Sequence, residues 1–172
     1  MIKILAAFTV IVCSGAIGLI IAKQYSLRPI QLRNFQFSLQ MLATDISYAA
    51  IPLPEALLSL SKKTDKRIAD VFKLAGEMLN SRVGYTADEA WEYALSQIIP
   101  KTALKSADQE ILINLGKSLG LSDREDQIKH IQLAITQLEQ QISIAQSEKD
   151  KNEKVWKYLG FCTGLMLVIF II

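Results

Sequence analysis

The chain has 172 residues with 19 Lys and Arg, 17 Asp and Glu, one His and two Cys, and 51% of its residues are apolar. This length suits one domain of ordinary size and leaves no room for a two-domain enzyme. The formal net charge is only +2, whereas nucleic-acid binding needs a strongly basic surface. The high apolar fraction excludes intrinsic disorder. A positive mean hydropathy in so short a chain indicates that part of it lies in lipid.

The apolar excess lies at the two ends of the chain. Residues 4–22 are 19 consecutive uncharged residues, roughly 28 Å of helix, which is enough to cross the hydrocarbon core of a bilayer. Residues 158–172 are also uncharged but span only about 22 Å as a helix. Trp156, Tyr158 and the neighbouring lysines are typical of an interfacial anchor that extends this segment. We predict transmembrane helices in residues 1–23 and 158–172 and a helical bundle in residues 24–157.

Cationic residues flank both apolar segments on the side that faces the middle of the chain, whereas the outer flanks hold only Lys3. Since cationic flanks favour the cytoplasmic side, the middle is predicted to be cytoplasmic and both termini to lie outside. The inner cations are Lys23, Arg28, Arg33, Lys149, Lys151, Lys154 and Lys157.

A cleaved signal peptide is the alternative interpretation of the N-terminal segment. Ile20 is too large for the small position three residues before a cut at Lys23, and lipoprotein processing at Cys13 would need a small residue in place of Val12. Cys13 and Cys162 lie in the two predicted membrane helices, where they are small apolar residues, so no disulfide framework is predicted.

The middle of the chain has helical periodicity and no convincing strand pattern. Pro29 and Pro54 suit first-turn positions, and Trp91 lies among alanines on a helix face, which favours a core position over a partner-binding anchor. Capping-box spacing joins Thr86 with Glu89, Ser106 with Gln109 and Ser122 with Glu125. We predict an all-α bundle of six helices, over about 29–50, 54–61, 65–80, 86–97, 106–119 and 123–158.

The last predicted helix carries an apolar seam with heptad spacing, which is typical of a helix packed against a neighbour. Two interpretations stay open. Short, connected helices favour an intramolecular bundle, whereas the same seam in a second copy would give a dimeric coiled coil and a homo-oligomer. The seam residues are Ile128, Ile131, Ile135, Leu138, Ile142 and Ala145.

The sequence contains no motif for catalysis or cofactor binding. It lacks the glycine-rich loop and lysine that bind a nucleotide, and His130 is the single histidine, too few ligands for a transition metal. Asp123, Glu125 and Asp126 could be paired carboxylates, but acids in the first turn of a helix complement its dipole. We therefore predict a non-catalytic protein with no cofactor, no metal and no small-molecule substrate.

Three segments carry a resemblance to a known family: PLPEAL at 52–57, DEAWEYAL at 88–95, and LGKSLGLSDREDQIKHIQLAITQLEQQ from Leu115. With the two apolar ends and the length, they resemble the stage III sporulation protein AB family of endospore-forming bacteria over the whole chain. The SDREDQ turn is the most specific of these pieces.

The resemblance implies a fold and a role. The family is similar in fold to the cytoplasmic domains of the type II secretion platform protein F, which are six-helix bundles. A member would lie in the mother-cell membrane around the forespore, as the platform of a channel complex between the two compartments. It would work beside a cytoplasmic ATPase, stage III sporulation protein AA. No catalytic residue is carried over from the family.

Asp123, Arg124 and Glu125 are the residues that we expect at a partner contact, because they belong to the family's motif at a tight turn where folding needs only Gly120 and the Ser122 cap. The alternative is that they cap the helix and brace the turn. Two functions follow: a structural platform coupled to the ATPase, or a membrane-anchored signal transducer or sensor that acts as a coiled-coil dimer.

Overall fold

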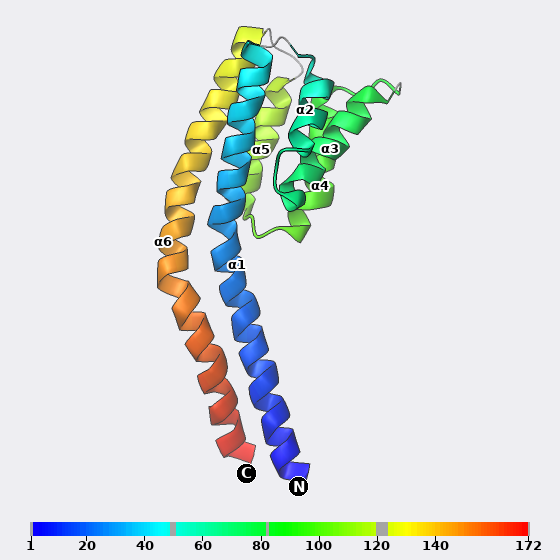
Figure 1. Ribbon diagram of the computed structural model, residues 1–172. Coiled ribbons are helices and arrows are strands. Elements are labelled where there is room, and N and C mark those ends of the chain that lie inside the picture. The colour runs from blue at the N-terminus through cyan, green and yellow to red at the C-terminus, as the bar shows by residue number, and fades with distance from the viewer. Residues whose placement is uncertain (1, 49–50, 82, 120–123, 172) are drawn as a thin grey trace. The chain divides into compact units, whose positions relative to one another are not determined.

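A computed structural model describes residues 2–48, 51–81, 83–119 and 124–171 (Figure 1). Within these ranges the regular structure is helical throughout and contains no strand, which confirms the predicted all-α class. The elements are α1 (Ile2–Ser47), α2 (Leu53–Ser61), α3 (Lys66–Asn80), α4 (Ala87–Ile98), the 3₁₀ turn η1 (Ile99–Lys101), α5 (Ser106–Leu119) and α6 (Arg124–Ile171).

The chain divides into two compact units. The first, which we call the helix pair, consists of residues 1–29 and 143–172, and the second, the bundle, consists of residues 30–142. Helices α1 and α6 each contribute one part to the helix pair and one part to the bundle, whereas α2 to α5 belong to the bundle alone.

Helix α1 passes through Pro29 without a break, so the prediction of a separate helix that begins at Pro29 is wrong. A proline inside a helix removes one backbone hydrogen bond and costs about 3 kcal/mol. Here its neighbours are held firmly: Arg28 is ion-paired with Glu148 at 2.7 Å, and the buried Gln31 accepts a hydrogen bond from the Ala103 N–H at 2.7 Å. These contacts offset the free-energy cost of the proline. Because α1 and α6 continue into the apolar ends, the described chain has six α-helices in all.

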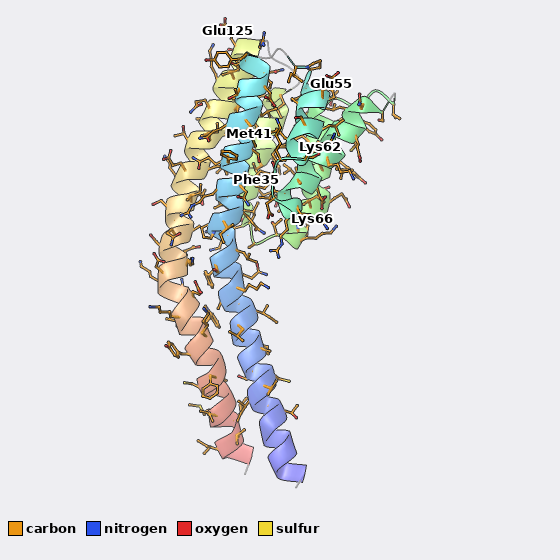
Figure 2. All side chains as sticks on the ribbon, in the orientation of Figure 1. Phe35, Met41, Glu55, Lys62, Lys66 and Glu125 are labelled. Carbon is orange, nitrogen blue, oxygen red and sulfur yellow. The ribbon has the colours of Figure 1, made fainter. Side chains whose placement is uncertain are left out.

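The core of the bundle is a row of three aromatic rings. Phe35 on α1 lies 5.9 Å from Phe72 on α3, and Phe72 lies 5.7 Å from Trp91 on α4, between ring centroids. All three side chains are buried, and the indole N–H of Trp91 donates to the Leu112 carbonyl of α5 at 2.8 Å. The prediction that Trp91 is a core residue is confirmed. One row of rings thus joins four helices, and Figure 2 labels Phe35 on α1.

Capping residues set several helix starts. The Thr86–Glu89 capping box on α4 is present as predicted, with both reciprocal hydrogen bonds. At α5 the predicted Ser106 cap is wrong by one position: the helix already includes Ser106, and the buried carboxylate of Asp108 accepts from the Lys105 N–H at 2.8 Å. The predicted Ser122 cap and Gly120 stop lie outside the described residues.

The heptad seam of α6 is packed within one chain. Ile131, Ile135 and Leu138 in the bundle are buried, and so is Ala145 in the helix pair. Ile128 and Ile142 are half-buried. Burial within a single chain favours the intramolecular interpretation of the seam over pairing with a second copy.

Gly116 on α5 gives a test of this core, because a Cβ there would stand 2.4 Å from Cδ1 of Trp91. Trp91 is fully buried between α4 and α5 and cannot move aside, so Gly116→Ala should destabilise the bundle by about 1–3 kcal/mol. Helix propensity alone predicts the opposite sign, since Ala is favoured over Gly by about 1 kcal/mol.

The measurement is the thermal unfolding midpoint of the full chain in mild detergent, followed by circular dichroism. Asn114→Ala on the exposed face of α5 is the matched control and should leave the midpoint unchanged or raise it. An equal rise for both variants would contradict the close packing of Trp91 on Gly116.

Candidate functional site

Two small-residue motifs face each other in the helix pair. Ser14 and Gly18 stand four residues apart on α1, and Gly160 and Gly164 stand four apart on α6. The hydroxyl of Ser14 donates to the Gly160 carbonyl, and a Cβ on Gly18 would lie 2.8 Å from Cα of Gly160. The backbones therefore touch, as in small-xxx-small packing of membrane helices.

The two helices of the pair run antiparallel. Ser14 contacts Gly160, whereas Arg28, further along α1, contacts Glu148, earlier on α6. This order places the two chain ends at the same end of the pair, as Figure 1 shows. An apolar groove of about 630 Å³ follows the two helices; its lining includes Cys13, Ile17, Trp156 and Leu159.

The Arg28–Glu148 ion pair holds the other end of the helix pair. Arg28 is only 3% exposed and its guanidinium donates to the Glu148 carboxylate at 2.7 Å. A buried guanidinium needs a charged partner because it cannot lose its proton, so this contact fixes the pairing of α1 with α6. In the sequence Arg28 is only a flanking cation, and its position directly before Pro29 gives no sign of burial.

Helix α1 has the length and composition of a candidate membrane span. Between Thr9 and Ser47, α1 contains a window with mean hydropathy 1.6 that is long and apolar enough to cross a membrane, and only 11% of that window is buried. Among the described residues no second helix meets the same test. The uncharged stretch at the C-terminal end of α6 is short. The charged residues Glu153, Lys154 and Lys157 lie just before it.

The predicted partner residues lie at the start of α6. Asp123 lies outside the described residues. Arg124 donates from Nε to the Ile46 carbonyl and from a terminal guanidinium nitrogen to the Ser47 carbonyl at 3.0 Å, so it caps the C-terminal end of α1. Glu125, which is labelled in Figure 2, is exposed at the end of the bundle where α6 begins. Arg124 thus has a structural contact, and Glu125 leaves its carboxylate on the surface.

Acidic charge marks this end of the bundle at neutral pH. The Lys129 ammonium donates to the Asp126 carboxylate at 2.8 Å, and this hydrogen bond holds the pKa of Asp126 below its usual value. Asp126 therefore stays ionised at neutral pH, and its stabilising contact is lost only as the pH falls through that lowered pKa. Asp126 and Glu125 both stand in the first turn of α6, where acids complement the helix dipole.

No group of three or more His, Cys, Asp or Glu side chains that could hold a metal is present in the described part of the chain. The contacts described above are packing and capping contacts.

Together the observations define an all-helical protein with one helix that is long and apolar enough to cross a membrane. The sequence model of the family described as stage III sporulation protein AB matches residues 3–172, and the chain belongs to that family. The resemblance seen in the sequence is confirmed.

Two relatives agree with this assignment. The stage III sporulation protein AB of Bacillus subtilis (strain 168) is 34% identical over 171 residues, with 99% of each chain covered. A solved structure of a stage III sporulation protein AB is 31% identical and superimposes with a TM-score of 0.68, over 73% of this chain and 98% of the other. The chain is therefore a sporulation protein with a helical fold shared by its relatives.

Gly18 and Gly15 provide a matched pair for testing the helix pair. A Cβ at Gly18 would meet the Trp156 carbonyl at 2.7 Å, whereas a Cβ at Gly15 would have nothing within 4 Å. We expect Gly18→Val to separate α1 from α6 and Gly15→Val to leave them packed, since backbone contact cannot accommodate the added methyl groups.

The measurement is disulfide formation between Ser14→Cys and Gly164→Cys in native membranes, with Cys13 and Cys162 replaced by Ala. The Cβ positions of residues 14 and 164 lie 3.2 Å apart, close to the spacing of a disulfide. Oxidation should cross-link the parent and the Gly15→Val chain and fail in the Gly18→Val chain. Equal cross-linking in all three would refute the tight pairing.

Proposed function

We propose that the protein is a non-catalytic membrane platform of a sporulation channel complex between mother cell and forespore, coupled to a cytoplasmic ATPase. The observation that carries this proposal is the continuity of α1 and α6: each is a single helix with one part in the bundle and one in the apolar helix pair. A continuous helix transmits force along its axis, which suits a protein that links a soluble motor to a membrane complex.

The helix pair supports a double-spanning topology. The apolar end of α6 is short for a membrane crossing, yet it packs backbone to backbone against α1 through Gly160 and Gly18. In lipid such packing stabilises a second span beside a first one. The antiparallel order and the inner cations favour a cytoplasmic bundle with both termini outside, in the mother-cell membrane around the forespore.

The ATPase contact is proposed for the end of the bundle where α6 begins. Asp123, Arg124 and Glu125 form the most family-specific segment, and the exposed Glu125 offers a charge for recognition. The resemblance implies that the partner is a stage III sporulation protein AA-like ATPase. Electrostatic contacts of this kind set the rate and specificity of association.

Topology is the first test of the proposal. Single cysteines are introduced by Ser81→Cys and after Ile172 in a chain whose Cys13 and Cys162 are replaced by Ala. Intact cells are treated with a membrane-impermeant thiol reagent. The cysteine at position 81 should be protected because the bundle is cytoplasmic, and the C-terminal cysteine should react because α6 crosses. Reaction at position 81 would end the ATPase-platform proposal.

The partner contact is tested by reversing one surface charge. Glu125→Lys should weaken binding of the ATPase to the full chain in detergent by about tenfold or more and leave the unfolding midpoint unchanged. Glu139→Lys makes the same charge change elsewhere on the exposed surface of α6 and should bind normally.

Arg124→Gln is the structural comparison, because it removes the hydrogen bonds to the end of α1 and should lower the unfolding midpoint. Equal affinities for Glu125→Lys, Glu139→Lys and the parent chain would show that the exposed start of α6 is not the contact surface.

A further inference from the structure

A hollow on the surface of the bundle lies where α3 ends and α4 begins. Its volume is about 510 Å³, and it is lined by Met78 of α3, Tyr85 of the connecting loop, and Glu89 and Tyr93 of α4. This size lies within the range of sites that hold a small ligand or a few side chains. We call it the tyrosine pocket. All four residues belong to the bundle, so its shape depends on that unit alone.

The packing of α4 does not account for the residues of the tyrosine pocket. One side of the DEAWEYAL segment lies in the core with Trp91, whereas Glu89, Glu92 and Tyr93 are exposed. Tyr85 and Tyr93 are 44% and 49% exposed, and neither phenol hydroxyl bonds to another residue of the described chain. Exposed tyrosines beside a hollow are typical of a protein contact site.

The ends of the two helices hold the tyrosine pocket in shape. Gly84 has a φ of 85°, in the left-handed region that other residues rarely adopt, and so turns the chain toward α4. The Thr86 N–H donates to the Glu89 carboxylate at 2.9 Å and fixes that side chain. At the end of α3 the Ser81 hydroxyl donates to the Met78 carbonyl at 2.6 Å. A pocket formed in advance loses less conformational entropy when a partner binds.

The charge beside the pocket is negative. Helix α4 carries Asp88, Glu89 and Glu92 and contains no Lys or Arg. Glu92 stands three residues after Glu89, so the two carboxylates are neighbours on the helix surface. Only Oε2 of Glu89 is bonded within the described chain, to the Thr86 N–H, which leaves Oε1 open to a ligand. The pocket therefore combines a carboxylate oxygen with two aromatic rings.

We propose that the tyrosine pocket binds an arginine side chain of a partner protein. A planar guanidinium can stack on a tyrosine ring and donate to a carboxylate at the same time, and Tyr93 and Glu89 supply both groups one turn apart on α4. The acids of α4 complement a cation and disfavour an acidic segment. A lysine ammonium fits less well, because it is a compact and strongly hydrated charge that cannot stack. This contact is separate from the one proposed at Glu125 and does not depend on it.

The test titrates the full chain in dodecyl maltoside with the peptide acetyl-glycyl-arginyl-glycinamide. Of the four methionines, Met78 lines the pocket, so its isotope-labelled methyl signal in nuclear magnetic resonance reports occupancy, and Met41 is the internal reference. The Met78 signal should shift and saturate while the Met41 signal stays in place. The citrulline peptide, which lacks the charge, should need an about tenfold or more higher concentration for half-saturation, and the lysine peptide should also bind more weakly.

Two variants separate the carboxylate from the ring. Glu89→Gln removes the charge and keeps a residue type that suits a capping box, and Tyr93→Leu removes the ring and keeps an apolar side chain. Each should raise the half-saturating concentration of the arginine peptide by about fivefold or more. Glu110→Gln on α5 and Tyr48→Leu just after α1 make the same changes at other exposed positions and should titrate like the parent chain.

Several outcomes would overturn the proposal. One is a Met78 signal that does not shift or does not saturate in the parent chain. Another is equal affinity for the arginine peptide and either the citrulline or the lysine peptide, which would show that the guanidinium is not what is recognised. A Met78 signal that changes when the chain alone is diluted would assign the pocket to a second copy. Parent-like titration of both Glu89→Gln and Tyr93→Leu would show that the peptide binds elsewhere.

Discussion

The continuity of α1 through Pro29 is the constraint on which the rest of the structure depends. The N-terminal part of this helix supplies Ser14, Gly18 and Arg28 to the helix pair, and the C-terminal part supplies Phe35 to the aromatic row of the bundle. A break at the proline would separate these two sets of contacts. Buried hydrogen bonds and the ion pair on either side of Pro29 keep the helix formed where local propensity favours an end.

The helix pair combines two kinds of contact with different physical origins. At the apolar end, the glycines have no side chain, so the two backbones touch. Dispersion forces and the Ser14 hydrogen bond hold the helices together there. At the other end, Arg28 and Glu148 make a charged contact that is costly to form and costly to break. The pair therefore has an apolar end and a charged end.

Much of the fold was predictable because it is local. Apolar periodicity gave the short helices, and the Thr86–Glu89 spacing gave a helix start that the structure contains. Pro29 was misassigned because a distant contact, between Arg28 and Glu148, outweighs the local preference. Ser106 was misassigned because Asp108, three residues after Lys105, caps the helix one position earlier. The site was only half predictable: the motif pointed to Arg124, but its bond to the end of α1 joins residues 78 apart, which no spacing rule reveals.

The charges of the bundle explain why net charge is a poor guide to its surfaces. A total of +2 excludes an evenly basic protein, yet Figure 2 shows Lys66 at one end of the bundle and Glu125 at the other. Asp126 is paired with Lys129, whereas the neighbouring Glu125 is exposed, so the local charge at the start of α6 differs from the total. Arg124 caps the C-terminal end of α1 and lies directly before the acidic residues Glu125 and Asp126. A change of its charge therefore alters both the cap and the charge of the surface beside it.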